Sequence, residues 1–452
     1  MIIIGIILVF ASIILTLVGI LADKVLILVF PPILVICGAY LIIKGHEKER
    51  LKTGEKEISM IEVKRAQQLV KTSYSKDDVI VLLKDLSADM KEMGTKEREM
   101  MIQSGVHYSE MLPQEKAPSE EYEALYNKAV AEKKLEIALG IARVSEIMWA
   151  RKNGEYPVII SLARAGIPVG ILIKRYLKSQ YGVDCPHYAI SIIRDRGIDV
   201  NAMEYIWTHE VRCGQASVKD FFFVDGWTGK GAIKTQLEEA VAELKEQEEQ
   251  DGITSALRKW TELSDNLYVL ADPANITPYC GTHMDYLLPS ACLNSTVSGL
   301  TSRTILNKFV HVKDGDFHGA TYFERFESID KSNEFIDLIS AEFGNIPLDF
   351  TEDFDKLNEL EDGWNGMSIV QDICHLMQVE DYKKVKPGIG ETTRVLLRRV
   401  PWKVLINKDI PETDPDIQHI LVLCKEKNIP TMRWDLGNYK VCGIIKELSA
   451  DA

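Results

Sequence analysis

Two long uncharged runs open the chain, 1–22 and 25–43, and only Asp23 and Lys24 separate them. Each run holds about 20 residues, enough to cross a hydrocarbon core about 30 Å thick as a helix. The pattern therefore predicts a transmembrane helical hairpin over 1–44. A cleaved signal peptide over 1–22 is disfavoured, because no basic segment precedes this run and a second apolar run follows it. The next basic residues place the rest of the chain in the cytoplasm and the hairpin in the inner (cytoplasmic) membrane; they are Lys44, Lys48, Arg50 and Lys52.

Beyond the hairpin the apolar positions follow a different pattern. Helical spacing fills 76–150, and from Val158 short β-rich runs alternate with amphipathic helices. This alternation predicts an α/β fold in which helices cover both faces of a parallel sheet, after a helical N-terminal extension. Ligands of such sheets bind at the carboxyl ends of the strands. The expected strands are 158–162, 187–193, 220–225, 267–272 and 285–289, and the expected helices are 168–180, 200–208, 230–248 and 294–307.

A small unit with its own pattern ends the chain. Its elements are expected in the order helix, strand, helix, strand, helix, which predicts a small α/β/α layer. Its start, 383–403, holds seven basic residues and one acidic residue. The predicted domains are the hairpin over 1–44, a juxtamembrane stalk over 45–75, the α/β domain over 76–340, an acidic linker over 341–380 and the small unit over 381–452.

Composition limits the classes of protein that fit. Apolar residues make up 46% of the chain and charged residues 27%, which excludes a disordered or fibrous protein. Lys and Arg number 53 against 67 Asp and Glu, so the net charge of -14 excludes a globally basic nucleic-acid coat. The eight cysteines include no CxxC pair, so their spacing favours neither a zinc ribbon nor a disulfide framework. Isolated, reduced cysteines are typical of a cytosolic domain.

Three loops at expected strand ends carry residues suited to binding phosphate. In the first, Asp225 ends a strand, and a Thr-Gly-x-Gly turn then opens a helix, whose N-terminus favours an anion. In the second, Arg164 offers a planar fork for pyrophosphate oxygens. Arg194 and Arg196 lie in the third and are expected to close over phosphates. The remaining candidates for substrate binding are Ala165, Gly166, Thr228, Gly229, Lys230, Gly231 and Ala232.

These motifs resemble those of known families. The segment Val224–Ile233 resembles the phosphoribosyl-pyrophosphate signature of type I phosphoribosyltransferases, and Ser161–Gly166 resembles their pyrophosphate loop. Most of 75–330 is similar to the StiP family, which is associated with tellurite-resistance and stress gene clusters. That family carries two labels, phosphoribosyltransferase-like and cysteine protease. The stretches similar to it are Leu82–Leu86, Ile102–Leu112, Ser161–Gly166, Val224–Ile233 and Pro289–Thr304.

The transferase resemblance implies a type I phosphoribosyltransferase-like sheet and a concrete mechanism. Asp225 would hold the ribose hydroxyls, directly or through Mg²⁺, and the backbone of 228–232 would hold the 5′-phosphate. Arg164 would hold the pyrophosphate, so Asp225 and Arg164 would be the catalytic residues. Gly226 stands where the usual signature has a second acid. The leading hypothesis is thus a membrane-anchored enzyme that binds a phosphoribosyl (pyro)phosphate with Mg²⁺, in a stress-response pathway that makes or processes a nucleoside-like metabolite or RNA.

The protease label implies a second hypothesis. Cys292 follows an expected strand near the start of an expected helix, and a helix N-terminus lowers the pKa of a thiol. This makes Cys292 the candidate nucleophile, with His107 or His318 as its base. His283 is a further candidate base, and Asn294 or Asp316 are candidates to orient one.

The small C-terminal unit supports a third hypothesis. The segment Gly388–Arg394 opens a basic helix and resembles the turn of the Pelota-type RNA-binding domain, although Gly390 replaces an Asn of that motif. Basic residues at such a turn suit RNA phosphates. The chain would then be a non-catalytic, membrane-tethered RNA-binding protein. The candidate RNA-binding residues are Lys386, Gly388, Glu391, Arg394, Arg398 and Arg399.

Overall fold

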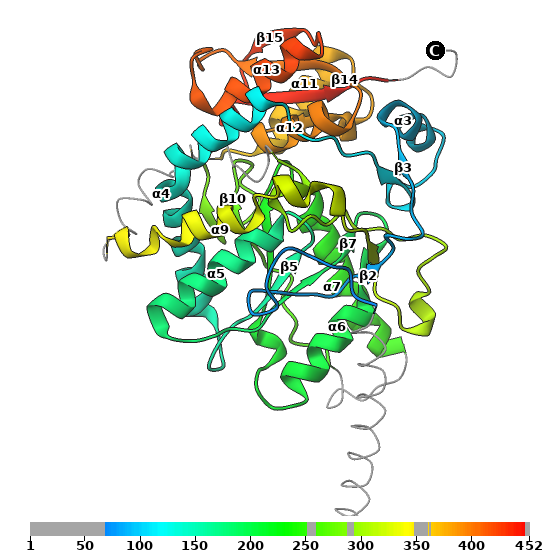
Figure 1. Cartoon of the computed structure of the whole chain (residues 1–452), viewed down its shortest axis with the longest axis vertical. Helices are drawn as coiled ribbons and strands as arrows, with labels where there is room; N and C mark the ends of the chain where they lie inside the picture. The colour runs from blue at the N-terminus through cyan, green and yellow to red at the C-terminus, as the bar shows by residue number, and fades with distance from the viewer. Residues whose placement is uncertain (1–67, 251–258, 287–292, 348–359, 361–362, 448–452) are drawn as a thin grey trace, which may run out of the picture. The chain divides into compact units, whose positions relative to one another are not determined.

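The computed structural model describes residues 68–250, 259–286, 293–347, 360 and 363–447 (Figure 1). At its centre lies a six-stranded sheet with the strand order β1-β6-β5-β9-β10-β11, in which neighbouring strands all run parallel. The strands are β1 (Ile80–Val81), β5 (Val158–Leu162), β6 (His187–Ile190), β9 (Phe221–Trp227), β10 (Leu267–Ala271) and β11 (Cys280–Thr282).

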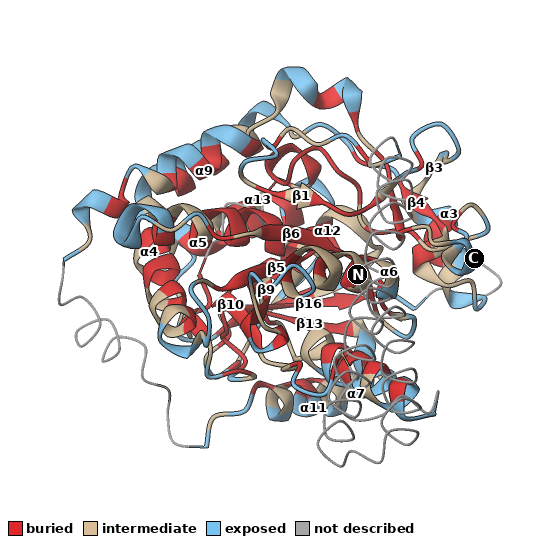
Figure 2. Cartoon of the chain, turned by 90° about the horizontal axis from the view of Figure 1, so that it is seen from below, coloured by how far each residue is buried: buried red, intermediate tan, exposed pale blue. Residues whose placement is uncertain are grey.

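Helices cover both faces of this sheet because its strands are apolar on both sides. Alternate residues of one strand enter different clusters: Phe222 and Val224 of β9 pack with one set of helices, and Phe221 and Phe223 with the other. The strands are buried along most of their length, with Asp225 and Trp227 at the end of β9 half-buried, whereas the outer faces of the helices are exposed (Figure 2). The first set is α4 (Glu120–Arg151), α5 (Gly166–Tyr181) and α9 (Ser332–Ser340), and the second is α6 (Val200–Ile206) and α7 (Ala232–Gln250).

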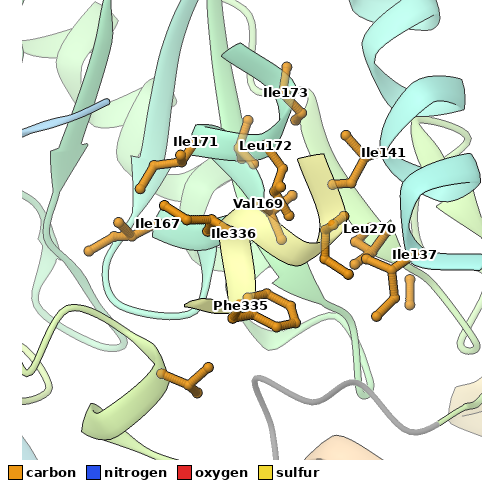
Figure 3. Close-up of a cluster of buried hydrophobic side chains, with 14 of the residues drawn as sticks. Ile137, Ile141, Ile167, Val169, Ile171, Leu172, Ile173, Leu270, Phe335 and Ile336 are labelled. Atoms are coloured by element: carbon orange, nitrogen blue, oxygen red, sulfur yellow. The ribbon is translucent and has the colours of Figure 1, made fainter. Parts of the chain in front are cut away.

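The first cluster is built around helix α5. Ile137 and Ile141 of α4, Phe335 of α9 and Leu270 of β10 converge on its apolar side chains (Figure 3). Local sequence signals set the limits of these helices. The Ser119 hydroxyl accepts from the Tyr122 backbone N–H at the start of α4. Gly182, with a φ of 70°, ends α5 in the left-handed region that glycine adopts without strain.

Short elements lie outside the main sheet. The structure pairs β2 (Lys84–Asp85) with β12 (Gly319–Ala320), β3 (Glu92–Met93) with β4 (Leu112–Pro113), and β7 (Ile192–Ile193) with β8 (Gly197–Ile198). Helix α3 (Thr95–Gln103) follows β3.

The C-terminal domain, 363–447, has a four-stranded sheet of its own with the order β13-β16-β14-β15. Its strands are β13 (Val385–Pro387), β14 (Pro401–Asn407), β15 (Thr431–Trp434) and β16 (Val441–Ile445), and its helices are α11 (Gly366–Met377), α12 (Ile389–Arg398) and α13 (Gln418–Glu426). The element expected as a final helix is strand β16, which lies between β13 and β14 and is antiparallel to both. Five buried apolar or small residues in succession suit a central strand.

Two further expectations near residue 290 are corrected. Residues 294–307 do not form a helix, and only a 3₁₀ turn at Ser295–Val297 is present. Asp285 and Tyr286 belong to no strand, and 287–289 lie outside the described residues. The sixth strand is instead β11, which contains Gly281. A Cβ there would lie 2.4 Å from the Gly140 carbonyl oxygen, so helix α4 approaches this strand closely because residue 281 is glycine.

The predicted membrane hairpin is also corrected. None of the helices that the structure describes between residues 68 and 447 is long and apolar enough to cross a membrane. Residues 1–44, on which the prediction fell, lie outside the described residues. The described residues form a mixed α/β fold with a parallel sheet, and they give no support to the predicted membrane partner and membrane location.

Candidate thiol site at the carboxyl edge of the sheet

A cysteine and a histidine lie in contact at the last strand of the main sheet. Cys280 begins β11, and His283 follows the end of that strand. The Cys280 Sγ lies 3.4 Å from the His283 Nε2, within hydrogen-bonding reach for sulfur. The other ring nitrogen, Nδ1, lies 2.9 Å from the Asp272 carbonyl oxygen. The sulfur also lies 3.8 Å from Nδ1, so it lies against the side of the ring and meets the Nε2 lone pair only after the imidazole or the thiol rotates. When Nδ1–H donates to the Asp272 carbonyl, Nε2 is the nitrogen left to act as a base.

The Asp272 side chain is held rigidly beside this pair. Its carboxylate accepts from the backbone N–H groups of Ile276 at 2.7 Å and Thr277 at 2.8 Å, and from the Thr228 hydroxyl. Burial raises the pKa of Asp272, although these hydrogen bonds oppose the shift. Asp272, Cys280 and His283 each offer one side-chain atom that could ligate a metal ion, and these atoms all lie within 4.8 Å of one another.

A positive charge also lies at the sulfur. Arg143 of helix α4 donates to the Cys280 carbonyl, and its Nη1 lies 3.8 Å from Sγ. A guanidinium beside a sulfur favours the thiolate over the neutral thiol. The thiolate is the more nucleophilic of the two forms. Cys280 and Asp272 are buried, whereas His283 is half-buried, so the imidazole is the more accessible side of the site.

Two other imidazole pairs have hydroxyl partners but are closed to solvent. Ser161 Oγ and Thr393 Oγ1 each lie 2.8 Å from the Nε2 of a histidine, His187 and His419 respectively. Both histidines are buried, and burial lowers the pKa of each to about 3. These imidazoles are therefore neutral at physiological pH and belong to the core.

The residues predicted for the protease hypothesis are placed as follows. Cys292 lies outside the described residues. The His107 ring nitrogens contact the Ser109 hydroxyl at 2.8 Å and the Arg194 carbonyl at 3.0 Å. His318 is buried, and its Nδ1 lies 2.9 Å from the Ser191 hydroxyl. Burial lowers the pKa of both histidines. Within the described part of the chain, neither ring is placed against a cysteine sulfur.

The predicted phosphate-binding loops make contacts with the protein itself. Arg164 is buried, pairs with Glu115 at 2.9 Å and donates to the Thr301 carbonyl at 2.7 Å. Lys230 donates to the carbonyls of Tyr382 at 2.5 Å and Val385 at 2.8 Å. Two further arginines pair with acids, Arg194 with Asp195 at 3.4 Å and Arg196 with Glu110 at 2.9 Å.

The glycines of these loops serve close packing. A Cβ on Gly166 would lie 2.3 Å from the Val224 carbonyl oxygen, and one on Gly229 would lie 2.6 Å from Glu391 Cγ. The neighbouring residues Ala165, Gly231 and Ala232 complete the turns that enter α5 and α7. Burial raises the pKa of Asp225 to about 6, and its Oδ1 accepts from the Gly226 N–H. The Mg²⁺ ion expected there stays a prediction.

The predicted RNA-binding residues of the C-terminal domain lie against the N-terminal part of the chain. Arg399 pairs with Glu99 at 2.6 Å, and Arg398 with Glu115 at 3.4 Å. Lys386, Gly388 and Arg394 surround the start of α12 with Glu391.

The sequence indicated His283 as a base but missed Cys280 and Asp272 as its partners. The only signal was the spacing Cys-x-x-His at 280–283.

Comparison with known proteins gives two matches to family models. Residues 72–340 match the family described as tellurite-like stress resistance cysteine protease StiP, and residues 364–447 match the PELOTA RNA binding domain. The cysteine protease StiP of Acinetobacter baylyi is 30% identical over 384 residues, which are 83% of this chain and 94% of that protein. The first match contains Asp272, Cys280 and His283.

A solved structure gives only a weak likeness. LysN, an alpha-aminoadipate aminotransferase from Thermus thermophilus complexed with N-(5'-phosphopyridoxyl)-L-leucine, is 10% identical. The match covers 70% of this chain and 77% of the LysN chain. Its TM-score of 0.16 is too low to indicate a shared fold.

The comparisons overturn the leading functional hypothesis. Both StiP matches name a cysteine protease and neither names a phosphoribosyltransferase, so the transferase activity and the phosphoribosyl substrate predicted from the sequence are wrong. The resemblance to the StiP family and to the Pelota-type domain is confirmed. Since the family model covers more than half of the chain and the relative aligns with most of it, this chain belongs to the StiP family.

Proposed function

We propose that the chain is a cysteine protease, in which Cys280 is the nucleophile and His283 its general base. The Sγ–Nε2 distance of 3.4 Å carries the proposal, because it brings a thiol within reach of an imidazole whose other nitrogen is hydrogen-bonded. The names of the matched family and of the A. baylyi relative support the same reaction class.

The reaction uses the thiol and the imidazole in two steps. His283 takes the thiol proton, and the Cys280 thiolate attacks the carbonyl carbon of the scissile peptide bond. The protonated His283 then gives its proton to the leaving amine as the C–N bond breaks, which leaves a thioester on Cys280. In the second step His283 removes a proton from water, whose oxygen attacks the thioester. The carboxylic acid product leaves and the thiol regains its proton. Arg143 favours the thiolate in this cycle.

Burial of Cys280 makes the described state a latent one. The Asn438 side chain of the C-terminal domain donates to the carbonyls of His283 at 2.9 Å and Pro273 at 3.0 Å. Trp364 Nε1 donates to the same Pro273 carbonyl at 3.0 Å. These contacts hold the loops that carry Asp272 and His283, and access of a peptide to the buried thiol requires these loops to move. The match of that domain to an RNA-binding family supports RNA as a second partner.

Hydrolysis of fluorescent casein by the purified chain tests the proposal. Cys280→Ser should reduce the rate by at least about a thousandfold, because a hydroxyl is a poor nucleophile beside a base selected for a thiol. Cys213→Ser is the matched control, because Cys213 is an exposed cysteine, and it should keep the full rate.

Cys292→Ser separates the two candidate nucleophiles. Cys292 remains the nucleophile predicted from the sequence, with His107 or His318 as its base. Loss of hydrolysis in Cys292→Ser together with retention in Cys280→Ser would overturn the assignment to Cys280 and keep the protease. Absence of hydrolysis by the unmodified chain, with and without RNA, would overturn the protease itself.

A further inference from the structure

The basic end of the C-terminal domain is covered by the rest of the chain. We use "α12 face" for Lys386, Glu391, Arg394, Arg398 and Arg399. Their side chains are only 13–39% exposed. This face lies in the basic segment 383–403 of a domain that matches an RNA-binding family. Basic residues that bind RNA phosphates are expected to be exposed to solvent when no RNA is bound. On the α12 face they are covered by other parts of the chain instead.

A carboxylate takes the position of a phosphate at one end of the face. Glu99 of helix α3 accepts from Arg399 twice, from Nε at 2.6 Å and from Nη2 at 2.8 Å. Burial opposes ionisation of Glu99, but its bonds with Arg399 prevail and lower its pKa. Glu99 is therefore a carboxylate at neutral pH. A two-bond fork between arginine and an anion is also the geometry by which arginine holds a phosphate.

A second carboxylate and an aromatic ring complete the cover. Glu115, which is buried, lies 3.4 Å from Arg398 Nη2. The Arg394 guanidinium lies 4.7 Å from the centre of the Trp227 ring, at the end of β9. A Cβ on Gly390 would lie 2.5 Å from that ring, so glycine is required for the ring to approach α12. An aromatic plane against arginine is the contact that an unpaired base makes in single-stranded RNA recognition.

The same docked domain contacts the loops that carry the thiol site. Asp285, two residues after His283, accepts from the backbone N–H groups of Ile389 at 2.9 Å and Lys440 at 2.8 Å. The Tyr439 hydroxyl donates to the Gly229 carbonyl at 2.8 Å. With the bonds of Asn438 and Trp364, these contacts attach the C-terminal domain to the loops after β9, β10 and β11.

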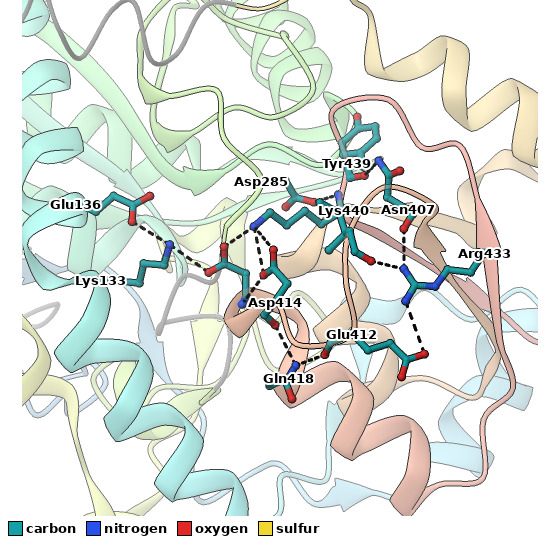
Figure 4. A network of polar contacts seen from close by, with 12 residues as sticks. Lys133, Glu136, Asp285, Asn407, Glu412, Asp414, Gln418, Arg433, Tyr439 and Lys440 are labelled. Atoms are coloured by element: carbon teal, nitrogen blue, oxygen red, sulfur yellow. Dashed lines mark hydrogen bonds and ion pairs between the residues drawn. The ribbon is translucent and has the colours of Figure 1, made fainter.

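An ionic network supplies a further anchor at helix α4. Lys440 pairs with Asp414 at 3.1 Å and Asp416 at 2.5 Å, and Lys133 of α4 lies 3.3 Å from Asp416 (Figure 4). Asp416 is almost fully buried, so this network is not an ordinary surface pair. The docked domain is thus held by backbone bonds and by charge pairs, and its Ile417 and Ile420 also belong to the same buried apolar cluster as Ile137 of α4.

We propose that RNA and the N-terminal part of the chain compete for the α12 face, and that RNA binding displaces the carboxylates of Glu99 and Glu115 and the Trp227 ring. Displacement loosens the domain from the loops after β10 and β11 and opens the path to Cys280. The competition stands on the contacts alone, whereas its effect on catalysis rests on the proposed protease function. RNA is thereby an activator of the thiol site rather than its substrate.

Binding of a fluorescein-labelled RNA stem-loop to the full chain, followed by fluorescence anisotropy, tests the competition. Glu99→Gln keeps the shape of the side chain but removes the charge that holds Arg399. It should bind the RNA about three- to tenfold more tightly, as expected for a competing ion pair of ordinary strength. Asp435→Asn is the matched control, because it breaks the exposed pair with Lys408 within the C-terminal domain and should leave the affinity unchanged. Arg399→Gln should weaken binding.

Hydrogen exchange of the unmodified chain gives a second test that needs no variant. Saturating RNA should increase exchange of the backbone amides in 225–231 and 283–285, which the docked domain covers. Tight RNA binding without increased exchange, or an unchanged affinity in a folded Glu99→Gln, would overturn the competition. Neither measurement uses hydrolysis. Increased exchange with no gain in casein hydrolysis would keep the competition and reject the activating role.

Discussion

The pairs Cys280–His283 and Ser161–His187 share one pattern of contacts and differ in their surroundings. In each, Nε2 lies beside the side chain of a nucleophilic residue, at 3.4 Å and 2.8 Å respectively. In each, Nδ1 contacts a backbone carbonyl, that of Asp272 at 2.9 Å and that of Asp78 at 2.7 Å. If these contacts alone made a catalytic pair, the described residues would include both.

The surroundings decide which pair can react. Helix α5 presses on the serine pair, since a Cβ on Gly170 would lie 2.2 Å from Ser161 Oγ and 2.4 Å from His187 Nε2. The serine hydroxyl also lies 2.9 Å from the Gly166 carbonyl, which competes for its single hydrogen. The cysteine pair has a half-buried imidazole and a guanidinium 3.8 Å from its sulfur. The half-exposed imidazole and the charge at the sulfur, rather than hydrogen-bond contacts, distinguish the candidate active site from a core contact.

Replacing each histidine gives the largest contrast between the pairs. His283→Asn should reduce casein hydrolysis by about 10²–10⁴-fold, because the thiol loses its general base, and should leave stability nearly unchanged. His187→Asn should act in the opposite way, with a lower midpoint of urea unfolding and a rate per folded molecule within about twofold of the original. Equal loss of rate in the two variants would break the comparison.

Removing the serine hydroxyl tests the structural role of the buried pair. Ser161→Ala leaves His187 Nε2 without its hydrogen-bond partner in the core, so the free energy of unfolding should fall by ~1–3 kcal/mol. Urea denaturation measures this change, and hydrolysis should be unaffected. If hydrolysis falls while stability is kept, the serine pair has a role in the reaction.

The charge of Arg143 beside the Cys280 sulfur should raise the reactivity of the thiol. Arg143→Gln should lower the rate of alkylation of Cys280 by iodoacetamide about tenfold near neutral pH, because less of the sulfur is thiolate. Arg143→Lys keeps the charge and should retain most of the rate. Mass spectrometry of the Cys280 peptide measures both. Equal rates in the two variants would show that the guanidinium only supports the Cys280 carbonyl.

A change of pH should alter the opening of the loop at 283–285 and of the core around Ser161 in different ways. This effect should be smaller than those of the substitutions above. Burial raises the pKa of Asp285 to about 7, opposed by its two backbone hydrogen bonds and by Lys440, and Asp416 adds to the rise. The ordinary pKa of Asp is about 3.9, so between about pH 4 and pH 7 the docked state holds a proton that the open state lacks. Docking is therefore strongest at the acid end of this window and weakens as pH rises through it.

Exchange of amides 283–285, corrected for the intrinsic effect of pH, should thus increase between about pH 5 and pH 8, by less than tenfold per pH unit. Amides around Ser161 should not follow, because burial lowers the pKa of His187 to about 3, so opening of this core becomes less favourable as pH rises towards the ordinary His value of about 6.5. Asp285→Asn should remove the increase. A pH dependence that survives in this variant would assign the opening to another group.

The regions that the sequence predicted well are those whose pattern is local. Strands β5, β9 and β10 and helices α5 and α7 were expected within a few residues, because each strand is a continuous apolar run that ends at a glycine-rich turn or an acid. Strand β11 was missed because Cys280–Thr282 has no apolar run, and its packing against helix α4 depends on Gly281, where a Cβ would meet the carbonyl oxygen of Gly140, far away in the sequence.

The candidate site shows the same limit. Thr228 was expected to bind a substrate phosphate at a strand end, and in the structure its hydroxyl donates to Asp272. The basic charge of α12 was visible in the sequence, whereas its cover was not, because Glu99 and Arg399 lie 300 positions apart. Spacing along the chain cannot report which residues a distant domain brings together.

The most direct test of the account is to map the cysteine that a substrate-like electrophile modifies. The full chain is incubated with RNA and an epoxysuccinyl peptide, an inhibitor that alkylates activated protease thiols, and the adduct is located by tandem mass spectrometry. The account predicts an adduct on Cys280 that RNA accelerates and His283→Asn abolishes. An adduct confined to Cys292 or Cys213, with Cys280 unmodified, would contradict it.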